Sequence, residues 1–196
     1  MLIDILTSDK QKTSAWAGGI TRELLIFPPT ASYQARDFFV RVSCAVVELA
    51  SSDFSELPGF IRYIMPLSGN MKLEHSSKNA ELIAKVNLAP FDVHRFDGGW
   101  TTVSYGACTD FNLMLAEGWD GEIMPLKSSS IVTCEHDQLL SIFCLKPLSI
   151  KVRGDSYKLL AGDSFYADMT SGTEGITLSV DGGENEIAVL AKAWKA

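Results

Sequence analysis

The chain has 196 residues, of which 46% are hydrophobic and 21% charged, enough to bury the core of one large β domain or two small ones. Its formal net charge of −7 argues against nucleic acid as a partner and against docking on anionic membranes. The start of the chain lacks the basic leader and long apolar run of a signal peptide, because Asp4 interrupts the hydrophobic residues. We therefore expect a cytoplasmic protein with no nucleic-acid and no membrane partner.

Short runs rich in Val, Ile, Phe, Tyr and Thr, separated by turn residues, predict β-strands along the whole chain. In its first part the predicted strands are 2–6, 21–27, 38–48, 60–67, 71–75, 81–86, 90–96, 101–105 and 109–116. In its second part they are 130–134, 138–145, 148–153, 156–160, 164–167, 175–180 and 186–193. Long helical periodicity is nearly absent, which favours an all-β sandwich, jelly roll or barrel over alternating strands and helices.

A less regular stretch at about 117–130, with two glycines, a proline and three consecutive serines, divides a longer part of the chain from a shorter one. We expect an N-terminal lobe of residues 1–120 and a smaller C-terminal β lobe of residues 121–196. The connection is short and contains apolar residues, so the two lobes are expected to pack as a single compact unit, not to hang on a flexible tether.

Asp110–Met114 alternates polar and apolar side chains inside a segment that otherwise has the composition of a buried strand. Asp110 and Asn112 are two residues apart, so on a strand they point to one face, while Phe111 and Leu113 take the other. A carboxylate beside an amide suits a solvated sheet face or the polar lining of a β-barrel. Both interpretations stay open at this point.

Arginines occupy similar positions in two other strand-like runs. Arg41 and Ser43 share one face of the first run, and Arg62 lies within the second, which is otherwise apolar. An arginine in an antiparallel strand most often faces solvent. If the strands met in a barrel, the arginines could grip a carboxylate with a bidentate fork while Asp110 and Asn112 oriented the ligand.

The three histidines do not form a metal-binding pattern such as HxH or HExxH. His94 shares a predicted strand face with Asp92 and Phe96, and we expect it to be hydrogen-bonded or exposed. His75 and His136 lie beside polar turns and are expected to be exposed. We therefore predict no metal ligand and no other cofactor.

The four cysteines have no metal-like or CxxC spacing. Cys44, Cys134 and Cys144 lie in or beside apolar runs and are expected to be small buried hydrophobes. Cys108 lies at a predicted turn and is the one candidate for a reactive thiol. The glycine-rich segment 16–20 lacks a GxGxxG or P-loop pattern, so we interpret it as a tight loop before the strand at 21–27.

Several of these segments, taken in order between about residues 14 and 116, resemble the HutD/Ves family. The motifs that carry the resemblance are Gly18–Glu23 with its strand ending at Pro28, Arg41-x-Ser43, Phe54–Arg62, and Asp110–Met114. The resemblance implies a cupin-like fold with two β-sandwich lobes in one chain, a bicupin, without the usual cupin metal ligands. It also implies a link to histidine utilisation, in which binding of a small acidic catabolite such as N-formylglutamate has been proposed.

One motif departs from the family pattern. Relatives usually show Trp-x-Asn-Gly-Gly-Gly before the threonine that corresponds to Thr21, whereas here Ser14 stands at the Trp position and Trp16 at the Asn position. Ala17 replaces the first glycine of that motif. A ligand contact made by the family's Asn would therefore be altered in this chain.

The leading hypothesis is a metal-free, cupin-like protein that binds a small, carboxylate-bearing metabolite and has a regulatory role in histidine catabolism. Its predicted ligand-binding residues are Arg22 and Glu23 at the rim, Arg41 and Arg62 as anchors, and Ser43, Asp110 and Asn112 as orienting groups. In this hypothesis no residue is catalytic, and the protein can be either a monomer or a homodimer. One alternative is a hydrolase or isomerase that acts on such an acid with Asp110 as general base. A second is a structural or interaction module without a ligand.

Overall fold

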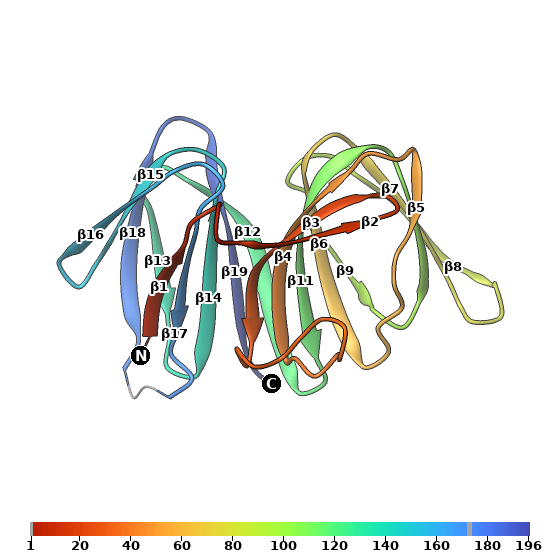
Figure 1. Ribbon diagram of the computed structural model, residues 1–196, viewed down its shortest axis with the longest axis horizontal. Coiled ribbons are helices and arrows are strands. Elements are labelled where there is room, and N and C mark those ends of the chain that lie inside the picture. The colour runs from red at the N-terminus through yellow and green to blue at the C-terminus, as the bar shows by residue number, and fades with distance from the viewer. Residues whose placement is uncertain (1, 172–173) are drawn as a thin grey trace. The chain divides into compact units, whose positions relative to one another are not determined.

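The computed structural model describes residues 2–171 and 174–196, and these residues form β-strands joined by turns and loops, without a helix. The strands assemble into two compact units, seen in Figure 1. One unit is Lys12–Glu117, and the other joins the residues up to Gln11 with Gly118–Ala196. Since the described part of the chain holds no helix, it holds none long and apolar enough to cross a membrane.

The Lys12–Glu117 unit is a sandwich of two antiparallel sheets. Its strands are β2 (Lys12–Trp16), β3 (Gly19–Phe27), β4 (Val40–Val47), β5 (Ser51–Asp53), β6 (Phe60–Ser68), β7 (Met71–Ser76), β8 (Leu82–Leu88), β9 (His94–Asp97), β10 (Thr101–Tyr105) and β11 (Cys108–Ala116). The six-stranded sheet has the order β2-β3-β4-β11-β6-β9, and the four-stranded sheet has the order β5-β10-β7-β8.

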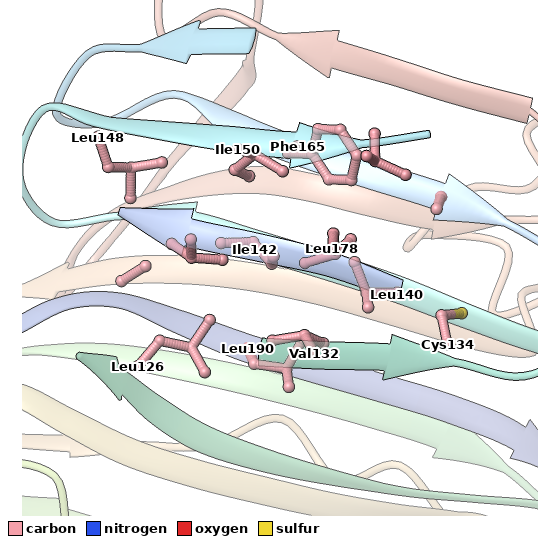
Figure 2. Packing of buried hydrophobic residues seen from close by; sticks show 14 of the residues in the cluster. Leu126, Val132, Cys134, Leu140, Ile142, Leu148, Ile150, Phe165, Leu178 and Leu190 are labelled. Atoms are coloured by element: carbon pink, nitrogen blue, oxygen red, sulfur yellow. The ribbon is translucent and has the colours of Figure 1, made fainter. Parts of the chain in front are cut away.

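The second unit repeats this two-sheet plan. Its strands are β1 (Leu2–Leu6), β12 (Trp119–Lys127), β13 (Ser130–Cys134), β14 (Gln138–Cys144), β15 (Leu148–Val152), β16 (Asp155–Leu159), β17 (Ser164–Asp168), β18 (Ile176–Gly182) and β19 (Glu186–Lys195). A five-stranded sheet, β1-β17-β14-β19-β12, faces a four-stranded sheet, β13-β18-β15-β16. Figure 2 shows its core, where Ile142 and Phe165 of one sheet pack with Ile150 and Leu178 of the other.

The predicted all-β fold class is confirmed, and each predicted strand has a counterpart whose ends differ by a few residues. Three strands were not predicted: β2, β5 and β12. β12 occupies the stretch at 117–130 that we expected to be irregular, because Gly121 and Pro125 interrupt its apolar alternation without breaking its pairing with β19. The segment 16–20 is the end of β2 and its hairpin turn into β3, a connection close to the expected tight loop.

The two units divide the chain differently from the predicted lobes at residues 1–120 and 121–196. β1 pairs with β17, Leu2 opposite Asp168 and Leu6 opposite Ser164, so the first strand belongs to the sheet of the later unit. Such a pairing joins segments more than 150 residues apart, and nothing local in the sequence signals it. The second boundary, at Gly118, lies within a few residues of the predicted one.

The core of the Lys12–Glu117 unit identifies the inner face of its six-stranded sheet. Val47 of β4, Cys108 of β11 and Ile64 of β6 pack with Met71 and Leu73 of the opposite sheet. Side chains alternate along a strand, so every second residue counted from these three also faces inward. The inward positions of the three strands that bear polar side chains are Arg41 and Ser43 of β4, Asp110 and Asn112 of β11, and Arg62 of β6.

Candidate functional site

Strand register gathers the inward polar side chains in the middle of the six-stranded sheet. On β11, Met114 lies opposite both Arg41 of β4 and Arg62 of β6, so one methionine separates the two arginines. Asn112, two residues earlier, lies opposite Ser43. These four polar residues and Asp110 are all buried, with exposed fractions of 1–6%. We call the set Arg41, Ser43, Arg62, Asp110 and Asn112 the inner polar cluster.

Arg41 has its charge partner within the fold. Its Nε donates to Glu23 Oε2 at 2.9 Å, and its Nη1 donates to Ser43 Oγ at 3.2 Å. The guanidinium also lies 4.4 Å from the centre of the Tyr33 ring. Glu23 lies opposite Ser43, directly before a register shift between β3 and β4 at Glu23–Leu25. Arg41 is therefore a neutralised, hydrogen-bonded side chain.

Arg62 has no such partner. Its guanidinium lies between two rings, 4.8 Å from the centre of Phe54 and 5.2 Å from that of Phe96. Its two hydrogen bonds are long: Nη1 donates to the Ser55 carbonyl and Nη2 to Asn112 Oδ1, both at 3.4 Å. Nε is buried without an acceptor, and among the described residues no carboxylate lies within ion-pair distance. Burial lowers the pKa of Arg62 to about 10, so it is still a cation at neutral pH.

Asn112 connects Arg62 to Asp110. Its Oδ1 accepts from Arg62, and its Nδ2 donates to Asp110 Oδ1, which fixes the orientation of the amide. Burial raises the pKa of Asp110 to about 7, against the opposing effects of the Arg62 charge and the Asn112 hydrogen bond. The Asp110 carboxyl is thus able to gain or lose a proton near neutral pH while its cationic neighbour stays charged.

The structure separates the two residues that we predicted at the rim. Glu23 is largely buried and belongs beside Arg41, as the ion pair shows. Arg22 is exposed and lies opposite Cys44, whose side chain points to the other face of the sheet. Adjacent residues of a strand point to opposite faces, so both could not join one cluster. Arg22 stays a predicted binding residue that the structure does not bring to the others.

Trp16, at the position where the family has Asn, lies in register with Gly19 and so with inward-facing Val47. Its indole Nε1–H donates to Thr21 Oγ1 at 3.1 Å. The ring also covers Gly18 so closely that a Cβ there would lie 2.1 Å from a ring carbon. In this chain the indole ring occupies the space that a side chain at residue 18 would need.

The prediction that His75 is exposed is wrong. His75 is fully buried on β7 among the inward residues Met71 and Leu73, and its Nε2 lies 3.0 Å from Nε2 of His94. Its Nδ1 lies 2.8 Å from the Thr102 hydroxyl. The period-two run Met71, Leu73, His75 carried the signal for burial, which the polar residues after it obscured. His94 is hydrogen-bonded, as expected, and His136 is exposed.

Both ring nitrogens of His75 have hydrogen-bond partners. Nδ1 pairs with the Thr102 hydroxyl, which also lies 3.4 Å from the Trp100 carbonyl oxygen. Nε2 of His75 pairs with Nε2 of His94, so one of these two nitrogens carries the proton that they share in the hydrogen bond. Burial, with smaller contributions from His94 and Arg62, lowers the pKa of His75 to about 4, and burial lowers that of His94. Both rings are therefore neutral at pH 7.

His75 gives a testable pH dependence of stability. Its folded pKa lies below its ordinary value of 6.5, so the unfolded chain binds its proton first and stability is lost as the pH falls from 6.5 toward 4. We expect this effect to cost about 2 kcal/mol between pH 7 and pH 4.5. Urea unfolding of His75→Gln should show a correspondingly shallower pH dependence than wild type. His136→Gln, at an exposed histidine, should keep the wild-type slope; equal slopes in all three proteins would contradict the assignment.

The expectation of a reactive Cys108 is also wrong. Cys108 begins β11 instead of lying in a turn, and its side chain is buried in the core. Burial, together with the nearby Asp110 charge, raises the pKa of its thiol to about 12. All four cysteines are buried and free, and Cys44, Cys134 and Cys144 agree with their expected role as small hydrophobes. Within residues 2–171 and 174–196, no three His, Cys, Asp or Glu side chains are grouped to hold a metal ion.

The HutD family model matches residues 8–188, most of the chain. The chain belongs to the HutD family. HutD from Pseudomonas fluorescens SBW25 superposes with a TM-score of 0.76 and 20% identity over 100% of both chains. A conserved protein of unknown function from Pseudomonas aeruginosa PAO1 superposes with a TM-score of 0.78 and 22% identity over 99% of this chain and 98% of that one.

The fold is cupin-like, as the HutD resemblance implied. The bacterial pirin YhhW from Escherichia coli, solved in complex with nickel(II), is similar to this chain with a TM-score of 0.66 and 9% identity over 99% of each chain. At that identity the likeness concerns the architecture alone. A search of curated proteins finds no match to this sequence.

Proposed function

We propose that this HutD-family protein binds a small, carboxylate-bearing metabolite within the Lys12–Glu117 unit, with Arg62 as the group that grips the carboxylate. The observation that supports the proposal is the buried Arg62 guanidinium, which has an unused Nε–H and no ion-pair partner among the described residues. A buried cation without an anion is costly to fold, and a ligand carboxylate would supply the missing charge. The family's link to histidine utilisation supports a role for such binding in histidine catabolism, and we propose that this role is regulatory.

The two arginines have different roles in this proposal. Arg41 was predicted as a second anchor, but Glu23 already neutralises its charge. Arg41 then holds Ser43 and lies one methionine away from Arg62, where it shapes the site without gripping the acid. Asn112 and Asp110, next to Arg62 on the inner face, would orient the polar part of the ligand.

Calorimetry tests the proposal with a panel of acids and a pair of variants. We expect N-formylglutamate or glutamate to bind wild type and the neutral diamide glutaramide not to bind. Arg62→Ala should weaken binding at least about 100-fold, since it removes a desolvated charge pair. Arg95→Ala is the matched control, because Arg95 is exposed on the next strand and its Nε donates to Tyr63 at 3.0 Å. No binding of any acid, or binding that ignores Arg62, would refute the proposal.

Asp110 favours one alternative, an enzyme that acts on the same acid. A carboxyl group with a pKa of about 7 is suited to accept and return a proton at neutral pH. Turnover of a bound acid by wild type that vanishes in Asp110→Asn would establish the enzyme. Binding without turnover would support the binding protein.

A further inference from the structure

Asn112 separates Arg62 from Asp110, the two ionisable groups of the inner polar cluster that form no ion pair with any described residue. It accepts from Arg62 on one side and donates to Asp110 on the other, so the amide stands between the guanidinium and the carboxyl. No direct ion pair between Arg62 and Asp110 lies within 4.0 Å among the described residues. Arg62 therefore interacts electrostatically with Asp110, but the Asp110 carboxylate does not occupy its Nε–H.

The charges of the cluster leave room for one anion. Arg41 and Glu23 neutralise each other, so Arg62 is the one cation of the cluster left to balance. An ionised Asp110 supplies that balance at a distance. A ligand carboxylate at Nε of Arg62 would be a second anion in the same buried region, where two like charges are strongly disfavoured.

Resting on the proposed function, we infer that the acid binds together with one proton, which Asp110 takes up as the ligand carboxylate replaces its negative charge beside Arg62. The proton comes from solvent and forms an O–H bond on Asp110; no other bond is made or broken. Asn112 Nδ2 occupies Oδ1 of Asp110, and the described residues offer Oδ2 no hydrogen bond. The new O–H can therefore donate from Oδ2 to an oxygen of the ligand.

The other ionisable groups around Asp110 do not compete for this proton. On β4 and β11, burial raises the pKa of the Cys44 and Cys108 thiols to about 12, so both stay protonated. On β7 and β9, burial lowers the pKa of His75 to about 4 and also lowers that of His94. The remaining ionisable groups in this region are Arg41 and Arg62 of the cluster, the Glu23 carboxylate paired with Arg41, and Tyr33, whose ring lies against the Arg41 guanidinium.

The test is calorimetry of N-formylglutamate and glutamate with wild type at pH 6 and pH 8. Since only the protonated form of Asp110 accepts the acid, affinity should fall about tenfold from pH 6 to pH 8. At pH 8 the binding heat should depend on the ionisation enthalpy of the buffer with a slope near one proton taken up. Asp110→Asn, which offers an N–H in place of the acid O–H, should show neither the pH dependence nor the buffer dependence.

The outcomes separate this inference from the function on which it rests. Binding with equal affinity at both pH values and no proton uptake by wild type would overturn the inference and leave the proposed function standing. No binding of either acid at either pH would refute both. The buffer dependence needs wild type alone, so the inference is falsifiable even if Asp110→Asn fails to fold.

Discussion

Arg62→Met is expected to abolish acid binding and to make the unliganded protein more stable by about 1–2 kcal/mol. The side chain is 6% exposed, carries a charge and makes two hydrogen bonds to the described residues, both at 3.4 Å. Methionine replaces the charged group with a flexible apolar side chain, which can pack beside Phe54 and Phe96, and it removes the desolvated charge. If Arg62 is there to bind an anion, it should lower the stability of the free protein, because its charge is balanced only when the ligand is bound.

Arg41→Met is the matched control, because Arg41 and Arg62 flank the same methionine and are equally buried. This substitution leaves the Glu23 carboxylate without its ion-pair partner, although the side chain is only 14% exposed. It should therefore lower the unfolding free energy by about 2 kcal/mol. Urea unfolding of both variants gives the comparison. The sign is decisive: if both arginine variants are destabilised alike, Arg62 is a structural residue and its charge is balanced within the fold.

Alternation in the sequence predicted which residues of the inner polar cluster share a face, whereas the prediction that this face is the inner one depended on the family resemblance. Period-two spacing placed Asp110 with Asn112, and Arg41 with Ser43, on the same side of their strands, and the structure agrees. Alternation is the same for an inward and an outward polar stripe, so the choice depended on what covers it. That cover is the four-stranded sheet, whose β5 was not predicted, since it has only three residues.

The local sequence pattern could not predict which charged side chains form ion pairs. Arg41 and Arg62 have similar sequence surroundings, yet Glu23 pairs with Arg41 alone. That pairing follows from the β3–β4 register near a β-bulge, which local pattern does not reveal. Arg22 was grouped with Glu23 because both belong to the Gly18–Glu23 motif of the family, whereas strand geometry sends neighbours to opposite faces. The same alternation, along Met71, Leu73 and His75 of β7, could have predicted that His75 is buried. The polar residues that follow His75 led instead to the prediction of an exposed side chain.

Asp110→Asn is expected to raise the unfolding free energy at pH 8 by about 3–4 kcal/mol relative to wild type. The pKa of Asp110 rises from its ordinary 3.8 to about 7 because the carboxyl is buried. Between these values the unfolded chain has released the proton that the folded chain keeps, so wild type loses stability as the pH rises. The amide of Asn is neutral at every pH and can still accept from Asn112. The two proteins should therefore converge in stability near pH 4.

Asp163→Asn provides a control of opposite sign at pH 8. Asp163 is equally buried, but its carboxylate accepts the backbone N–H groups of Ser8 and Leu160, both at 2.9 Å. Asn cannot accept both bonds as well, so this variant should be less stable than wild type. Denaturant unfolding of the three proteins at pH 4.5 and pH 8 makes the comparison. An Asp110→Asn protein no more stable than wild type at pH 8 would mean that the ionised carboxylate is well accommodated.

The same substitution links stability to binding. In wild type at pH 8, an ionised Asp110 weakens the free protein and must be neutralised before a second carboxylate can approach Arg62. Because binding at pH 8 must also bring a proton onto Asp110, a bound acid should stabilise the protein less at pH 8 than at pH 6. In Asp110→Asn there is no such charge to neutralise. The stability penalty and the pH dependence of binding should then disappear together, because both come from one carboxyl group.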